Sequence, residues 1–122
     1  MKKVLIIEDE PSLVAILTEK ITSEGFEVLK AGDGKEGLDK ALLGHPDLIL
    51  LDIIMPKMDG VTMLTKLRED EWGKKVPVVI LTNLSDDDMV SKSIQNGVFD
   101  YLVKADWKIE DLIDIIKRKL GE

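Results

Sequence analysis

The sequence predicts an α/β fold in which a five-stranded parallel sheet is covered by helices on both faces. Five short apolar runs alternate along the chain with segments of helical spacing, and each run is continuously apolar instead of alternating with polar residues. Strands buried on both faces read in this continuous way, and strand–helix alternation is typical of parallel sheets. Right-handed crossovers then favour a three-layer, doubly wound sheet with strand order 2-1-3-4-5.

The five expected strands are short and rich in Val, Ile and Leu, and polar or turn-forming residues bound them. They cover residues 2–7, 26–31, 47–51, 77–81 and 98–103. No repeat, low-complexity tract or long linker separates them, so we expect a single domain over residues 1–122.

The expected helices are recognised by apolar residues three and four positions apart. Pro11 suits the first turn of the first helix, and Gly25 and Gly44 follow helical stretches, where a left-handed residue commonly ends a helix. The segment 85–96 is the least regular, although Ser85 and the three acids after it form a strong helix start. The clearest apolar stripe lies near the end of the chain, at Ile109, Leu112, Ile113, Ile116 and Leu120.

Composition and charge exclude several classes of protein. Hydrophobic residues make up 44% of the chain and charged residues 34%, as in a soluble globular domain. There is no cysteine, which excludes disulfides and thiolate metal sites and suits the cytoplasm, where we expect the protein to act. No apolar segment reaches the length of a membrane span. A net charge of −7 makes the chain by itself a poor binder of nucleic acid.

Reactive side chains stand where four of the apolar runs end. Glu8 and Asp9 follow the first run, Asp52 the third, Thr82 the fourth and Lys104 the fifth. The carboxyl ends of parallel strands lie at one edge of a sheet, where ligands bind in a crevice, so we expect these groups to converge. Because a buried unpaired carboxylate is costly, we expect Asp52 to lie at the lip of that crevice and not to be buried.

The expected cluster of three carboxylates indicates a hard divalent cation. Neighbouring carboxylates repel one another, and Mg²⁺ relieves that repulsion with oxygen ligands and waters. A single histidine and no cysteine argue against zinc. Lys104 and Thr82 can then face an anion, and together with a metal they match the needs of a transferring phosphoryl group. An aspartate is a competent nucleophile for phosphorus and gives an acyl phosphate.

On these residues the chain resembles the receiver domain of two-component response regulators, chemotaxis-regulator-like, over essentially its whole length. The matching stretches are "VLIIEDEP" (4–11), "DLILLDIIMPKMDG" (47–60), "VPVVILTN" (76–83) and "GVFDYLVKA" (97–105). The resemblance implies a flavodoxin-like (β/α)5 fold and a phosphoacceptor signalling switch in a phosphorelay. It implies a regulatory domain that assists only its own phosphorylation and dephosphorylation, and not an enzyme.

The resemblance also implies how the acids act. Asp52 is the phosphoacceptor. Together with Asp9 and the backbone carbonyl of Ile54, it binds Mg²⁺ directly, and Mn²⁺ can substitute. Glu8 acts through a metal-bound water. Each of these roles is carried over from the family onto the matching position of this sequence.

The remaining site residues are implied to read the phosphoryl group. Lys104 pairs with carboxylate or phosphoryl oxygens, Thr82 swings its hydroxyl onto the phosphoryl group, and Tyr101 follows it inward as an aromatic switch. The weakly anchored segment 85–96 then suits the moving part. The implied partners are a sensor histidine kinase or phosphotransfer domain and an unknown output domain or effector protein. Direct nucleic-acid or membrane contact is not expected, and the expected state is a monomer or weak homodimer.

Three departures from the family's commonest pattern carry their own expectations. Ala105 stands where a proline usually follows the lysine, and a cis bond there would cost about 2.5–4 kcal/mol, so we expect a differently shaped loop. Ile54 and Leu84 are apolar, and they occupy two positions that flank the phosphoryl group in members of the family. We expect them to hinder an attacking water and so to prolong the phosphorylated state. Receivers of winged-helix transcription factors typically have two adjacent acids before the aromatic residue, whereas this chain has Phe99 and then Asp100. This difference weakens any inference that the chain forms the dimer of that class, through its fourth helix, fifth strand and fifth helix.

Three other functions stay open on the residues alone. A flavin-binding electron carrier shares the sheet order but needs a hydroxyl- and glycine-rich phosphate loop where Glu8, Asp9 and Glu10 stand. A phosphohydrolase with an aspartyl nucleophile usually has a second acid two residues after Asp52, where Ile54 stands. The third alternative is a degenerate receiver that acts only as a docking module. Such a receiver would lack site residues, whereas this chain has all five residues of the implied site, which are Glu8, Asp9, Asp52, Thr82 and Lys104.

Overall fold

The computed structural model describes residues 1–52, 58, 60–82, 100–103 and 108–121, with residues 61, 82 and 100–103 described for their backbone alone. The segment 85–96, expected as a helix, lies outside the described residues. None of the described helices is both long and apolar enough to cross a bilayer. The elements are β1 (Lys3–Ile7), α1 (Pro11–Ser23), β2 (Glu27–Ala31), α2 (Gly34–Gly44), β3 (Leu48–Asp52), α3 (Gly60–Arg68), β4 (Val78–Thr82), β5 (Asp100–Val103) and α5 (Ile109–Leu120).

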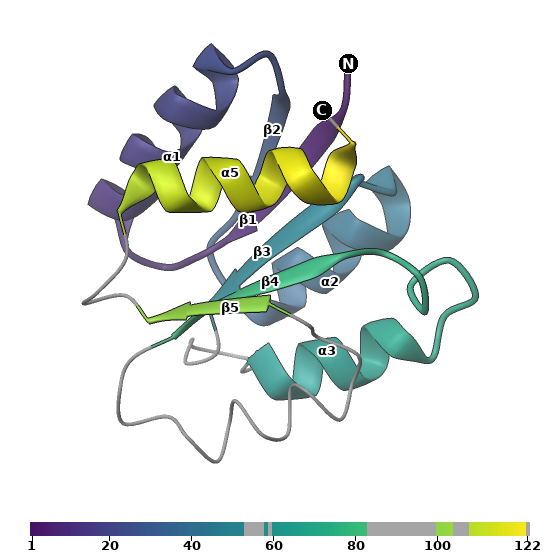
Figure 1. The fold of residues 1–122 in the computed structure, drawn as a ribbon. Helices are drawn as coiled ribbons and strands as arrows, with labels where there is room; N and C mark the ends of the chain where they lie inside the picture. The colour runs from purple at the N-terminus through teal and green to yellow at the C-terminus, as the bar shows by residue number, and fades with distance from the viewer. Residues whose placement is uncertain (53–57, 59, 83–99, 104–107, 122) are drawn as a thin grey trace.

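The five strands form one parallel sheet in the order β2-β1-β3-β4-β5, which confirms the predicted topology (Figure 1). The register pairs Ile7 of β1 with Leu51 of β3. It also pairs Thr82 of β4 with Val103 of β5. The carboxyl ends of β1, β3, β4 and β5 therefore lie side by side along one edge of the sheet.

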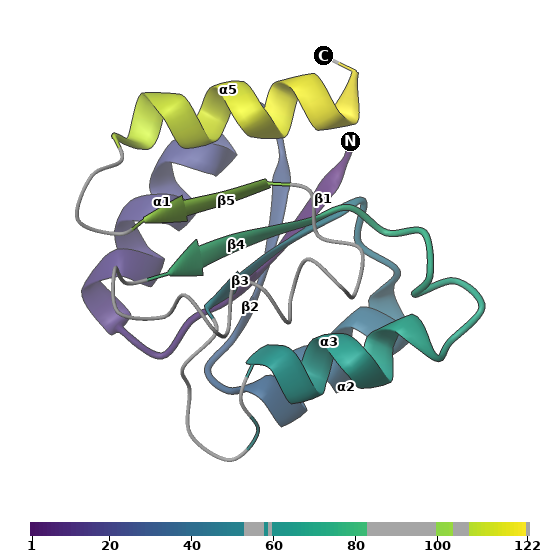
Figure 2. The ribbon, with the colours of Figure 1, turned by 60° about the horizontal axis from the view of Figure 1, so that its bottom comes forward.

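Helices cover both faces of the sheet, as Figures 1 and 2 show: α1 and α5 lie on one face, and α2 and α3 lie on the other. Successive side chains of a strand point to opposite faces, so each strand contributes to two cores. Ile6 and Leu50 belong to the cluster with α1 and α5. Ile7 and Leu51 belong to the cluster with α2 and α3. All four of these side chains are fully buried, which explains why the strands read as unbroken apolar runs.

The helix ends follow the predicted signals with one exception. Pro11 is the first residue of α1, and Gly25 after that helix has a left-handed φ of 95°. After α2, however, the left-handed residue is His45, with φ 45°, and Gly44 is still helical. The His45 amide donates to Ala41 O at 2.9 Å, and its ring stacks on Trp72 with centroids 4.3 Å apart. These contacts offset the cost of a left-handed residue that is not glycine.

An ion pair joins the two helices on one face, and we expect it to make stability depend on pH. Glu24, which caps α1, accepts from Lys117 of α5 with 2.5 Å between Oε1 and Nζ. This hydrogen bond and the charge of Lys117 lower the pKa of Glu24 below its ordinary value of 4.5. A carboxyl with a lowered pKa in the fold stabilises it above the unfolded-state pKa, and this contribution disappears as pH falls through the folded value.

We therefore expect Glu24→Gln to lower the midpoint of thermal unfolding slightly at about pH 7, because partly exposed pairs contribute little. The difference from wild type should shrink between about pH 5 and about pH 3. The matched control is Glu19→Gln, which removes one charge from the exposed side of the same helix. If Glu24→Gln lowered the unfolding midpoint by the same amount at about pH 7 and at about pH 3, this account would be contradicted.

Candidate metal centre at the carboxyl edge of the sheet

Three carboxylates meet where β1 and β3 end. Glu8 and Asp9 directly follow β1, and Asp52 is the last residue of β3, the strand beside it. The pairing of Ile7 with Leu51 sets the next residues, Glu8 and Asp52, at the same level of the sheet. One carboxylate oxygen from each of the three acids lies within 4.8 Å of the others. The convergence predicted for these three residues is therefore present.

Two of the three acids are buried, which corrects the expectation that Asp52 lies at the lip of the crevice. Asp52 is 5% exposed and Glu8 is 2% exposed, whereas Asp9 is exposed. The physical reason is that Asp52 still belongs to the sheet, since it pairs with Leu81 of β4, and β3 is the central strand. Asp52 is therefore part of the covered sheet, and its side chain does not project beyond the edge.

Backbone contacts hold the first acid in place. The Glu8 amide donates to Ala31 O of β2 at 3.1 Å, which extends the pairing of β1 with β2 past the end of the strand. Its carboxylate oxygen Oε1 accepts from the Glu10 amide at 3.2 Å. A carboxylate that is fixed in this way is ready to bind a ligand without further ordering.

The donor set fits a hard divalent cation. All three ligand groups are carboxylates, the chemistry that Mg²⁺ and Ca²⁺ prefer. Two oxygens on opposite sides of a Mg²⁺ ion lie about 4.2 Å apart, which is comparable with the spread of the oxygens here. Neighbouring carboxylates favour the binding of a cation, since it relieves their mutual repulsion. The site therefore has the ligand chemistry and the spacing that a hard divalent cation requires.

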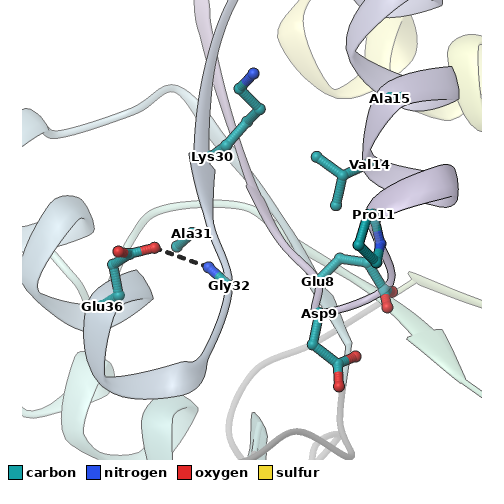
Figure 3. Close-up of a pocket in the computed structure, with 9 residues that line it drawn as sticks. All are labelled: Glu8, Asp9, Pro11, Val14, Ala15, Lys30, Ala31, Gly32 and Glu36. Carbon is teal, nitrogen blue, oxygen red and sulfur yellow. Dashed lines mark hydrogen bonds between the residues drawn. The ribbon is translucent and has the colours of Figure 1, made fainter.

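A cleft of about 370 Å³ opens beside the acids. Figure 3 shows Glu8 and Asp9 on one side of it, next to the apolar residues of the first turns of α1, while Lys30 and Glu36 stand across from them. Glu36 is held there because its carboxylate accepts from the Gly32 amide at 2.8 Å. The residues that line the cleft are Glu8, Asp9, Pro11, Val14, Ala15, Lys30, Ala31, Gly32 and Glu36. The cleft lies between the end of β1 with the start of α1 and the end of β2 with the start of α2, and the sequence patterns did not single out its walls at Lys30 and Glu36.

The other predicted site residues are described only in part. The backbone of Thr82 ends β4 at the same edge as Asp52, and Tyr101 lies in β5 beside it. Their side chains, and the whole of Ile54 and Lys104, lie outside the described residues, so their predicted contacts stay predictions. The same holds for the three departures from the family pattern, which involve Ile54, Leu84, Phe99 and Ala105.

Comparison with known proteins defines the class. Residues 4–117 match the model of the response regulator receiver domain. The receiver domain of the sensor histidine kinase PA1611 from Pseudomonas aeruginosa PAO1, solved with a magnesium ion in its active-site cleft, is 29% identical. It superposes with a TM-score of 0.89 over 99% of this chain and 98% of that one. The chain belongs to the response regulator receiver domain family, whose members are phosphoacceptor switches of two-component signalling.

The curated relatives are longer proteins. Hybrid signal transduction histidine kinase D of Dictyostelium discoideum is 40% identical over 110 residues, which cover 90% of this chain and 7% of that protein. The DNA-binding dual master transcriptional regulator RpaA of a Synechocystis strain is 33% identical over 120 residues, which cover 98% of this chain and 49% of that protein. This chain thus spans half or less of the length of these relatives.

Proposed function

We propose that Asp52 accepts a phosphoryl group from a phosphohistidine donor and that Glu8, Asp9 and Asp52 hold the Mg²⁺ required for the transfer. The observation that carries this proposal is the convergence of the three carboxylates within 4.8 Å at the carboxyl edge of a receiver fold. When bound, Mg²⁺ supplies positive charge against the phosphoryl oxygens. The carboxylate of Asp52 attacks phosphorus, an acyl phosphate forms, and the donor's P–N bond breaks with its electron pair returning to the imidazole.

The chain's own residues would bind and orient the reactants. Asp9 and Asp52, with the carbonyl of Ile54, would ligate the cation directly, and Glu8 would act through a water. This division suits their exposure, because the buried Glu8 is already held by the Glu10 amide, while Asp9 faces solvent. Mn²⁺ would substitute for Mg²⁺, since it takes the same oxygen ligands.

The signal would then travel along the sheet. Phosphorylation adds roughly −1.5 to −2 charges and three acceptor oxygens at the end of β3. Thr82 at the end of β4 and Lys104 after β5 would gain a partner, and Tyr101 in β5 would follow Thr82 inward. The pairing of Thr82 with Val103, directly before Lys104, supports this order because it joins the two strand ends. The switch is a two-state element that local charge biases.

For its partners, we propose a cytoplasmic sensor histidine kinase or phosphotransfer domain upstream and an output domain or effector protein downstream. Residues 1–122 would act as one receiver domain that promotes only its own phosphorylation and dephosphorylation, as a monomer or weak homodimer. A net charge of −7 supports leaving any nucleic-acid binding to an output domain.

The proposed function is tested by incubating the purified chain with Mg²⁺ and acetyl phosphate and recording its intact mass. We expect the gain of one phosphoryl group, and we expect none when a chelator removes the divalent cation. Unchanged mass with Mg²⁺ present, together with no measurable binding of Mg²⁺, would overturn the proposal.

A further inference from the structure

One peptide group joins helix α2 to the first acid of the site. The bond between Ala31 and Gly32 forms a planar unit whose carbonyl oxygen and amide hydrogen point in opposite directions. On one side, the Ala31 oxygen accepts from the Glu8 amide at 3.1 Å. On the other side, the Gly32 amide donates to Glu36 Oε1 at 2.8 Å (Figure 3). Glu8 and Glu36 therefore hold opposite ends of the same rigid unit.

The hydrogen bond to Glu36 reaches beyond helix α2. Asp33 caps this helix, and its carboxylate accepts from the Glu36 amide at 2.8 Å. In an ordinary capping box, the third residue of the helix bonds the amide of the capping residue itself, which here is Asp33. Glu36 is that third residue, and it bonds Gly32, one position earlier. The bond therefore fixes the chain that leaves β2, outside the helix.

The first turn of α2 packs directly on the end of β1. A Cβ atom added to Gly37 would lie 2.5 Å from Cδ1 and 2.8 Å from Cγ1 of Ile7, closer than real Cβ atoms come to other atoms. Ile7 is fully buried and directly precedes Glu8. Further along α2, the Lys40 ammonium donates to the carbonyl of Lys30 in β2. The helix that carries the anchoring carboxylate is thus itself fixed against both β1 and β2.

We propose that Glu36 is a positioning residue for the cation site, because it holds the peptide group that binds the Glu8 amide. The Glu8 carboxylate is one of the three whose oxygens meet within 4.8 Å. Its Oε1 also accepts from the Glu10 amide at 3.2 Å, so its backbone and its side chain are both held. An acceptor at one end of a peptide group strengthens the hydrogen bond at the other end, because the two bonds polarise one another. This inference rests on the proposed magnesium-dependent function.

Two substitutions of Glu36 separate its hydrogen bond from its charge. Glu36→Gln removes the charge but keeps an acceptor oxygen for the Gly32 amide, as glutamine does in capping boxes. Glu36→Ala removes both the charge and the acceptor. Glu36 is exposed and both replacements are good helix formers, so we expect both variants to fold. If Glu36 acts through the Gly32 amide, only Glu36→Ala loses affinity for Mg²⁺.

Asp70 offers a matched control. Its Oδ2 accepts from the Gly73 amide at 2.9 Å, which is the same kind of bond as the one between Glu36 and Gly32. Both residues lie in the connection between α3 and β4, which enters β4 at the edge of the sheet opposite the acids. Asp70→Ala therefore removes one carboxylate and one hydrogen bond to a glycine amide, away from the cation site.

The experiment measures the Mg²⁺ affinity of the wild type and the three variants by titration calorimetry, in about 0.15 M salt to screen exposed charges. We expect Glu36→Ala to lose about three-fold or more, within the range found for mutations along physically connected residues. Glu36→Gln and Asp70→Ala should stay within about two-fold of wild type. A smaller loss in Glu36→Ala, or an equal loss in Glu36→Gln or Asp70→Ala, overturns the inference.

Amide hydrogen exchange without Mg²⁺ tests the same network by a second measurement. Relative to the Leu50 amide, we expect the Glu8 and Gly32 amides to exchange about three-fold or more faster in Glu36→Ala and at the wild-type ratio in Glu36→Gln. Leu50 lies in the central strand, so this ratio removes any general loss of stability. An unchanged Glu8 ratio in Glu36→Ala overturns the inference. A wild type that binds no Mg²⁺ and gains no phosphoryl group would overturn the proposed function, and the inference would fall with it.

Discussion

Asp52→Asn is expected to abolish phosphoryl transfer to the protein while leaving it folded. The amide of asparagine is not a nucleophile for phosphorus at neutral pH, and it cannot form an acyl phosphate. The substitution also removes the negative charge of Asp52. This residue is only 5% exposed, and one of its carboxylate oxygens lies within 4.8 Å of an oxygen of Glu8 and of Asp9. We therefore expect the unfolding midpoint of the variant without Mg²⁺ to be unchanged or raised. Intact mass after incubation with Mg²⁺ and acetyl phosphate measures the first effect.

Glu8→Gln is the control for this prediction, because Glu8 is the other buried carboxylate of the cluster. Its phosphorylation should be slower, since the cation site is weakened, but the mass of one phosphoryl group should still appear. Asp114→Asn, on the exposed side of α5, should behave as wild type. Phosphorylation of Asp52→Asn at the wild-type rate would place the acceptor elsewhere on the chain.

Asp9→Asn is expected to separate two consequences of the cluster of three acids, namely the mutual repulsion of the carboxylates and their binding of Mg²⁺. Without a divalent cation, the variant should unfold at the same temperature as wild type or higher, because one of three mutually repelling charges is gone. With Mg²⁺, the wild type should gain stability and the variant should gain little, since a ligand that binds only the folded state stabilises it by an amount that rises with the logarithm of its concentration relative to its Kd. We expect the Mg²⁺ affinity of Asp9→Asn to fall by about ten-fold or more.

Thermal unfolding at increasing Mg²⁺ concentration measures both effects in one experiment. Asp114→Asn again serves as the control for a change of one charge, and its response to Mg²⁺ should equal that of wild type. A magnesium-dependent rise in midpoint of the same size in Asp9→Asn and in wild type would show that Asp9 is not part of the cation site.

Much of the fold could be predicted because the apolar pattern reports burial directly. Five continuous runs indicated five strands covered on both faces, and the described sheet has them in the predicted order. The stripe from Ile109 to Leu120 matches α5, whose Leu112, Ile113, Ile116 and Leu120 are buried. The end of α2 could not be predicted as well, because the stacking of His45 on Trp72 depends on a residue that is distant in sequence.

Part of the site could also be predicted, because parallel strands bring their carboxyl ends to one edge wherever they lie in the sequence. That rule placed Glu8, Asp9 and Asp52 together, and the structure has their oxygens within 4.8 Å of one another. The rule did not show how deeply each carboxylate is buried. Asp52 is covered because β3 is the central strand, a consequence of the packed sheet and not of the local sequence.

Within the described residues, the sequence by itself determined which strands and helices form and that Glu8, Asp9 and Asp52 reach the carboxyl edge of the sheet, because apolar periodicity is a local property of the chain. Only the tertiary structure decided that two of the acids are buried and that the backbone at Gly34 touches Met58. Burial and backbone contact depend on the distance between segments that are remote in sequence. Glycine at residue 34 is visible in the sequence, but the structural reason for it is the close approach of α2 to the Met58 carbonyl.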